Sequence, residues 1–300
     1  MKRARVIYNP TAGREQMKKS LPDVLQLLEN AGFEASAHAT TGENDATEAA
    51  SMACEREYDL IIAAGGDGTL NEVIHGMANH DYRPKVGIIP MGTTNDFARA
   101  LKIPKEPIEA MKIIIDGYSK KLDIGKANGH HFLNIAGGGK ITEVTYDVPL
   151  KLKTVLGQLA YYIKGIELLP QIRPVQTRIE YDGKVFEGEI MMFLVANTNS
   201  IGGFEKLAPN AVIDDGYFDL LILKKTNIAE FVFLANKALR GNHIYDDHVI
   251  YTHAKKIKVT PESTMHLNLD GEYGGELPGT FDILENHIEF FVPNKNNVEK

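Results

Sequence analysis

The chain has 300 residues and a formal net charge of −7. The length predicts two domains, and the charge argues against nucleic acid as a main partner. The single cysteine, Cys54, excludes an intramolecular disulfide and is typical of a reducing compartment. The longest apolar run, Ile190 to Ala196, is too short to cross a bilayer, and no export signal precedes it. We therefore expect a cytoplasmic protein.

The first part of the chain alternates segments that favour strands with segments that favour helices. Short apolar runs predict strands at residues 5–8, 60–64 and 86–89, and helical spacing of apolar residues predicts helices over 21–28, 46–53 and 70–77. Alternation of this kind favours an open parallel sheet with helices on its faces. We predict an α/β domain of this type over residues 1–124.

After residue 124 the pattern changes to short β-rich runs. Turn signals such as Asp182-Gly183 and Asp215-Gly216 separate these runs. They predict a β-sandwich-like domain over residues 125–286, with helical insertions near 150–169 and 227–240. Residues 287–300 hold a final strand and a polar tail, and that strand is free to return to the N-terminal domain.

The sharpest motif is a glycine-rich loop that leaves one predicted strand and opens a helix, Gly65-Gly66-Asp67-Gly68-Thr69. Glycines let the backbone approach a phosphate closely, and a helix N-terminus offers N–H groups to an anion. Asp67 would repel a phosphate unless a metal ion lies between them. The alternative interpretation is a tight strand-to-helix turn with an aspartate cap.

Two further loops follow predicted strands, and both have turn or cap interpretations of their own. Residues 9–14 read Asn-Pro-Thr-Ala-Gly-Arg, and residues 92–99 read Gly-Thr-Thr-Asn-Asp-Phe-Ala-Arg. Successive strands of a parallel sheet end at one edge, where open α/β sheets bind ligands. The standard P-loop is absent, because Thr93 stands where its lysine is required, and no GxGxxG motif opens a helix.

The loops at 65–72 and 92–99 together resemble the catalytic domain shared by diacylglycerol and sphingosine kinases. The first loop also occurs in NAD kinases, but the second is characteristic of the lipid-kinase branch. Further matching segments lie at 121–125, 214–217 and 269–272, so that the resemblance covers nearly the whole chain. It is strongest to the soluble bacterial diacylglycerol kinases of Gram-positive type, and it implies an NAD-kinase-like N-terminal domain with the active site in the cleft between two domains.

The resemblance implies a site for ATP and Mg²⁺. Its nucleotide-binding residues would be Asn9, Pro10, Thr11, Ala12, Gly13, Arg14, Thr40, Gly66, Asp67, Gly68, Thr69, Leu70, Asn71, Glu72 and Thr93. At position 14 close relatives tend to have lysine, and arginine keeps the charge but not the shape.

The resemblance also assigns the chemistry. It implies that Asp67, Asp96 and Asp123 surround the catalytic Mg²⁺, and that Glu272 takes the proton from the lipid hydroxyl with Asp270 nearby. It implies a structural Mg²⁺ at the Asp215 carboxylate and the carbonyl groups of Val212 and Tyr217. From the residues alone, Asp270-Gly271 is better explained as a hairpin turn, and Asp215-Gly216 has the same alternative.

These features predict ATP-dependent phosphorylation of diacylglycerol to phosphatidic acid. The alternatives are a kinase for another lipid alcohol, such as a sphingoid base or phosphatidylglycerol, and a silent regulator that only binds lipid or nucleotide. We expect the enzyme to meet its lipid transiently at the inner face of the membrane. Candidate docking segments are the amphipathic pattern at 150–169, which packing on the sandwich would also explain, and the basic segment at 237–243. A homodimer is compatible with an exposed sheet edge.

Overall fold

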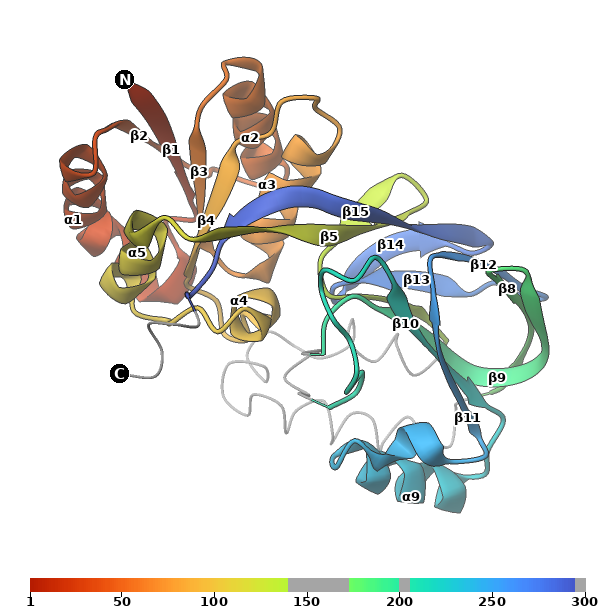
Figure 1. The fold of residues 1–300 in the computed structure, drawn as a ribbon. Helices are drawn as coiled ribbons and strands as arrows, with labels where there is room; N and C mark the ends of the chain where they lie inside the picture. The colour runs from red at the N-terminus through yellow and green to blue at the C-terminus, as the bar shows by residue number, and fades with distance from the viewer. Residues whose placement is uncertain (140–172, 200–205, 295–300) are drawn as a thin grey trace. The chain divides into compact units, whose positions relative to one another are not determined.

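The computed structural model describes residues 1–139, 173–199 and 206–294. Residues 1–122 together with 286–300 form one compact unit, and residues 123–285 form a second. The chain passes between them twice, within β5 (Ser119–Ala127) and within β15 (Gly279–Phe291). The predicted fold class, an α/β domain with a parallel sheet and a β-sandwich-like domain, is confirmed (Figure 1).

The sheet of the first unit is parallel. Its order is β2-β1-β3-β4, and the end of β15 adds a fifth strand, because Phe290 pairs in parallel with Val86 of β4. The strands are β1 (Lys2–Tyr8), β2 (Phe33–Ala39), β3 (Leu60–Gly65) and β4 (Lys85–Pro90). Every residue of β3 is buried, as its continuous apolar run requires for a strand in the middle of such a sheet.

Helices cover this sheet. They are α1 (Gln16–Asn30), α2 (Asp45–Glu55), α3 (Asp67–Ala78), α4 (Asp96–Ala100) and α5 (Pro107–Asp116), with a short η1 (Ala12–Glu15) before α1. Helix α2 packs against α3, and α1 packs against α5 (Figure 1). Cys54 is buried on α2. The helices predicted at 21–28, 46–53 and 70–77 are confirmed as parts of α1, α2 and α3.

The second unit is antiparallel. Its strands run in the order β14-β13-β7-β9-β8-β12-β15, and β10 pairs with both β9 and β11. The strands are β6 (His130–Phe132), β7 (Ile135–Gly138), β8 (Val175–Tyr181), β9 (Lys184–Ala196), β10 (Phe218–Lys224), β11 (Val249–Ala254), β12 (Lys256–Pro261), β13 (His266–Leu269) and β14 (Glu272–Glu276). Stacked Phe132 and Phe218, with ring centroids 5.6 Å apart, form part of its core.

Two-residue turns with positive φ connect neighbouring strands here. Asp182-Gly183 joins β8 to β9, and Asp270-Gly271 joins β13 to β14. These are the residues that type I′ hairpins prefer, and both turns follow the prediction. Asp215-Gly216 instead precedes β10 as a turn in a loop, so the hairpin interpretation is wrong for that pair, because no paired strand ends there.

The predicted helix at 227–240 is α9 (Ile228–Ala238), followed by η3 (Asn242–Tyr245). Asn227 and Glu230 form a capping box at its start, and Leu234 packs into a small second core with Leu221. The amphipathic pattern at 150–169 lies outside the described residues. None of the helices in the described ranges is both long and apolar enough to span a bilayer.

Candidate functional site

Three loops meet at the carboxyl edge of the parallel sheet. The Asn9 amide donates to the Ala64 carbonyl over 3.0 Å, and the Met91 amide donates to the Gly65 carbonyl over 2.7 Å. These two bonds extend the pairing of β1 with β3 and of β3 with β4 beyond the strand ends. The loops that follow β1, β3 and β4 are therefore held side by side, as the sequence predicts.

The glycines of these loops stand where the chain has no room for side chains. A Cβ on Gly92 would lie 2.7 Å from the Gly66 Cα, and a Cβ on Gly13 would lie 3.2 Å from the Met91 carbonyl oxygen. Gly13 also has a φ of +57°, which glycine adopts without strain. The glycine pattern therefore serves close packing of three backbones.

Asp67 begins α3, and Asp96 begins α4. The Thr94 hydroxyl donates to the Asp67 carboxylate over 2.9 Å, and Arg99 forms an ion pair with Asp96. Burial, followed by the charge of Asp96, raises the pKa of Asp67, and the bond from Thr94 opposes that rise. Two mostly buried carboxylates that repel one another are the electrostatic setting in which a cation binds.

The donor set of this edge suits Mg²⁺. The carboxylates of Asp67 and Asp96 carry hard oxygen atoms, and the buried Oδ1 atom of Asn71 on α3 has no hydrogen-bond partner. Such an acceptor fits a metal-bound water or a donor group of a nucleotide. Within the residues that the structure describes, no group of three or more His, Cys, Asp or Glu side chains is arranged to hold a metal.

Several predicted nucleotide residues have contacts within the protein. The Asn9 Oδ1 atom accepts from the Thr11 amide and hydroxyl, at 2.9 and 2.8 Å, which closes the first loop. The Thr40 amide donates to the Tyr8 carbonyl at the end of β1. The Glu72 carboxylate instead accepts from the Ala46 amide in the first turn of α2, at 3.2 Å. Glu72 thus stabilises the start of a neighbouring helix.

The remaining predicted residues of this group differ in exposure. The Leu70 side chain is buried on α3. Thr93 is exposed in the third loop. The Arg14 side chain lies outside the described parts of the chain.

Asn95 is a residue whose role the sequence reasoning missed. Its Oδ1 atom accepts from the Gly92 amide at 2.8 Å, and its Nδ2 atom donates to the Gly92 carbonyl at 2.7 Å. Asn95 has a φ of +50°, a conformation that asparagine tolerates better than most residues. The side chain therefore closes the third loop and sets the start of α4 at Asp96. An Asn-Asp pair after a glycine is a weak sequence signal for such a turn.

Asp123 belongs to the second unit and is completely buried. Its carboxylate accepts from the Gly216 amide at 2.7 Å, and its own amide donates to the Ile213 carbonyl at 3.0 Å. The Asn197 side chain donates to the Asp123 carbonyl at 2.9 Å. Asp123 therefore joins β5 to the loop at 213–216.

The two carboxylates predicted at the Asp270-Gly271 hairpin lie in different surroundings. Asp270 accepts three backbone bonds, from the Leu133 amide at 2.7 Å and from the Asn134 and Ile135 amides at 2.8 Å. Glu272, the first residue of β14, is exposed. The pair thus divides into one carboxylate that organises the loop at 133–135 and one that is exposed.

A buried polar cluster beside this loop was not predicted. The Asn197 Nδ2 atom donates to the Leu133 carbonyl at 3.0 Å as well as to Asp123, and the Thr198 hydroxyl donates to the Asn134 Oδ1 atom at 3.1 Å. The polar run at 197–199, directly after the apolar end of β9, was the available signal. Asn197 links Asp123 to the loop that Asp270 holds.

The predicted structural Mg²⁺ site lies on the turn before β10. The Asp215 Oδ1 atom accepts from the Tyr217 amide at 2.9 Å, which is a local turn bond. Val212 and Tyr217 are exposed, and Lys255 lies 4.7 Å from the centre of the Tyr217 ring. The second oxygen of the Asp215 carboxylate and the loop carbonyl groups are hard ligands of the kind Mg²⁺ takes.

Comparison with known proteins gives a consistent result for both parts of the chain. Residues 3–127 match the family model of the diacylglycerol kinase catalytic domain, and residues 143–292 match the model of the YegS C-terminal NAD kinase beta sandwich-like domain.

Relatives are similar over the whole length. The chain is 62% identical to a diacylglycerol kinase of Bacillus subtilis over 98% of each protein. It is 54% identical to a diacylglycerol kinase of Staphylococcus aureus, over 98% of this chain and 93% of that protein. A crystal structure of a diacylglycerol kinase from Bacillus anthracis superposes with a TM-score of 0.84 at 32% identity, over 99% of both chains.

Proposed function

The chain belongs to the diacylglycerol kinase family, and on that premise we propose that it transfers the γ-phosphoryl group of ATP to the free hydroxyl of diacylglycerol, giving phosphatidic acid. The observation that carries the proposal is the edge of the parallel sheet where three glycine-containing loops pack backbone against backbone beside Asp67 and Asp96. Phosphoryl transfer needs charge neutralisation, an in-line arrangement and a base. The described residues offer a candidate for each.

The loops at 9–13, 66–69 and 92–95 would bind the phosphates of ATP through their backbone amides and the N-terminus of α3. Asp67 and Asp96 would hold Mg²⁺ directly or through water. When bound, Mg²⁺ supplies neutralisation of the charge that develops on the phosphoryl oxygens. The raised pKa of Asp67 supports this assignment, because a bound cation would offset both burial, the larger cause of the rise, and the charge of Asp96.

Glu272 would take the proton from the lipid hydroxyl. It is exposed, and it directly follows the two-residue turn that joins β13 to β14. Asp270, whose carboxylate accepts three amide bonds, would act as a positioning residue by tying the hairpin to the loop at 133–135. The structural Mg²⁺ at Asp215, Val212 and Tyr217 stays a proposal, since one carboxylate and two carbonyl groups make a weak site.

The enzyme must meet its lipid at a membrane surface. The face of α9 and η3 exposes Val232, Phe233, Leu239 and Tyr245, with exposed fractions of 53%, 61%, 51% and 81%. Lys237 already pairs with Asp246 at 2.6 Å and lies over the Phe233 ring, so apolar side chains rather than net charge dominate this face. Aromatic and aliphatic side chains of this kind insert into the interface of a bilayer.

The proposed function is tested with mixed micelles containing diacylglycerol, ATP and Mg²⁺, and phosphatidic acid is measured for the wild type and for Glu272→Gln. We expect product from the wild type and a loss of about a hundredfold or more in the variant. Equal rates for both proteins would support the kinase activity but would show that Glu272 is not the base. Product only with a sphingoid base or phosphatidylglycerol would change the substrate, and nucleotide binding without turnover on any lipid would favour the silent regulator.

A further inference from the structure

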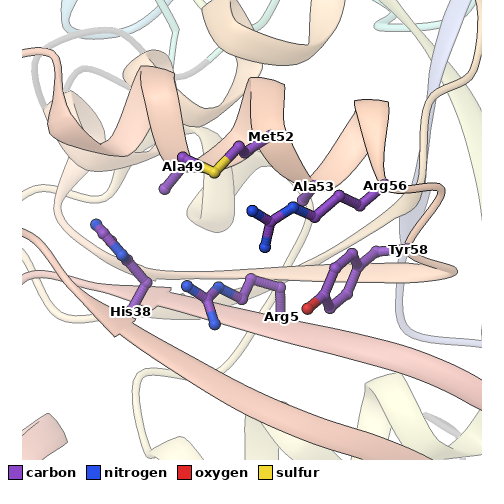
Figure 2. Close-up of a pocket in the computed structure, with 7 residues that line it drawn as sticks. All are labelled: Arg5, His38, Ala49, Met52, Ala53, Arg56 and Tyr58. Carbon is purple, nitrogen blue, oxygen red and sulfur yellow. The ribbon is translucent and has the colours of Figure 1, made fainter.

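The pocket between α2 and the strands β1 and β2 is too small to be a ligand site (Figure 2). Ala49 and Ala53 of α2 line it from one side, and Arg5 of β1 and His38 of β2 line it from the other. Its accessible space is about 20 Å³, which admits about one water molecule. A further role is instead indicated for a buried amide side chain of the second unit, that of Asn197.

Asn197 directly follows β9, and it is 1% exposed. Its Nδ2 atom donates to two carbonyl groups, that of Asp123 at 2.9 Å and that of Leu133 at 3.0 Å. Its backbone amide donates to the Asn134 carbonyl at 2.8 Å. Asn197 is therefore bonded to the loop at 133–135 through both its main chain and its side chain, and its side chain also bonds β5.

The same loop is bonded from its other side by Asp270. The Leu133 amide donates to the Asp270 carboxylate at 2.7 Å, whereas the Leu133 carbonyl accepts from Asn197. The Asp270 amide in turn donates to the Ile135 carbonyl at 2.9 Å. Strand β7, which begins at Ile135, pairs with β9 on one side and with β13 on the other. The ends of three neighbouring strands are therefore joined at this loop.

Glu272 lies close to this junction along the chain. It follows Asp270 and Gly271, the two residues of the turn that joins β13 to β14. A path of hydrogen bonds and one short turn therefore leads from Asn197 through Leu133 and Asp270 to Glu272. Every residue of this path belongs to the second unit. The position of the Glu272 backbone thus depends on how firmly the loop at 133–135 is held.

The Oδ1 atom of Asn197 is buried and, within the described part of the chain, accepts no hydrogen bond. An unpaired buried acceptor is unfavourable, and departures from full pairing are expected at functional sites. A leucine side chain of similar size would avoid the unpaired oxygen, but it would also lose both bonds of the Nδ2 atom. The amide at this position is therefore better explained by the two carbonyl groups that it holds than by packing.

We propose that Asn197 is a positioning residue for Glu272. The inference rests on the proposed function, in which Glu272 takes the proton from the lipid hydroxyl. A base acts within about 2.6–3.2 Å of the group that it deprotonates, and a displacement of about 1 Å can lower the rate about a hundredfold. Without the Nδ2 bonds, the loop at 133–135 would keep the bonds from Asp270 but lose those from the Asn197 side chain. The hairpin that carries Glu272 would then gain freedom to move.

Two variants of Asn197 and one control test the proposal. Asn197→Leu removes both Nδ2 bonds at a similar side-chain volume, and Asn197→Ser, which keeps one short donor, replaces it if the leucine variant does not fold. The matched control is Thr177→Val. Thr177 is also buried, and its hydroxyl donates to the Val175 carbonyl at 3.0 Å. It lies on β8, which β7 and β9 separate from β13 in the sheet.

Turnover of diacylglycerol in mixed micelles gives kcat and the KM for ATP. We expect Asn197→Leu to lower kcat about tenfold or more and to leave the KM for ATP within about twofold, because the base is displaced while the nucleotide loops are unchanged. Thr177→Val should retain both constants. In a Glu272→Gln background, Asn197→Leu should slow the reaction by no more than about a further twofold, because the group that it positions is already absent.

Hydrogen–deuterium exchange followed by mass spectrometry gives a measurement that does not depend on activity. Asn197→Leu should speed exchange in peptides that cover residues 133–135 and 270–273, because the bonds that hold these segments open more often. Thr177→Val should leave exchange in both segments unchanged.

The proposal is overturned if exchange in the hairpin is unchanged in both Asn197 variants, or if both variants keep the kcat of the wild type. It is also overturned if the losses caused by Asn197→Leu and Glu272→Gln multiply, which would indicate a general structural effect, or if Glu272→Gln alone keeps the full rate. A wild type that makes no phosphatidic acid would instead refute the proposed function, and the exchange measurement would still decide whether Asn197 holds the hairpin.

Discussion

The Asp270 carboxylate offers a direct test of how the hairpin is held. In Asp270→Asn one carboxylate oxygen becomes an NH₂ group, which cannot accept the amide bonds that Asp270 receives from the loop at 133–135. If the amide oxygen keeps the two bonds from Asn134 and Ile135, the buried Leu133 N–H loses its acceptor and faces another donor. Asparagine tolerates the φ of +50° at this position, so the backbone conformation is unchanged.

The expected cost follows from the bonds that are lost. One charge-assisted hydrogen bond disappears, two lose the charge of their acceptor, and one buried N–H is left unsatisfied. We expect the free energy of unfolding to fall by about 2–4 kcal/mol. The assay is urea unfolding followed by circular dichroism, because the chain has no tryptophan.

The hairpin at Asp182-Gly183 supplies the matched control. Asp182 also has a positive φ and accepts amide bonds, from Lys255 at 2.9 Å and Lys256 at 3.0 Å, but it is exposed. Asp182→Asn should therefore lower the free energy of unfolding by about 1 kcal/mol or less. A change within about 0.5 kcal/mol for Asp270→Asn, together with a large loss of activity, would refute the positioning role and place Asp270 in the chemistry.

Four further outcomes are expected. Asp67→Asn should abolish activity yet stabilise the metal-free protein at pH 7, because burial and the charge of Asp96 raise the pKa of Asp67. Thermal unfolding at several pH values should show this gain in stability vanish as the pH falls below 3.8. Asp45→Asn should lower the free energy of unfolding by about 1–2 kcal/mol at neutral pH after solvent screening, because bonds from Thr41 and then His38 lower the pKa of Asp45 to about 2. This difference in stability should disappear as the pH falls from 3.8 to 2. Phe233→Asp should lower activity on vesicles several-fold while sparing a water-soluble short-chain diacylglycerol, whereas Val185→Asp, at a comparably exposed site, should spare both. Chelation of Mg²⁺ should stop turnover and readdition should restore it, and turnover that survives full chelation would contradict the role assigned to the acids at the loop edge.

Local sequence was sufficient to predict structure wherever a residue type favours a narrow range of backbone conformations. Asp-Gly favours a turn with two positive φ values, and the pairs at 182–183 and 270–271 formed such hairpins, whereas Asp215-Gly216 formed a turn in a loop. Apolar periodicity located β3 and α3, because burial of one face or of a whole strand requires that pattern. Glycines at loop ends identified the edge where three backbones pack against one another.

Hydrogen bonds between distant segments required the tertiary structure. Asp270 accepts amides from residues 133–135, Glu72 bonds the first turn of α2, and Asn197 reaches both Asp123 and Leu133. A carboxylate or amide side chain has similar local preferences whichever distant donor it meets, so its sequence neighbours carry little information about that partner. The chain alone therefore determined the types of element and the residue types of the loops, and only the tertiary structure decided which carboxylate binds a distant backbone segment and which is exposed.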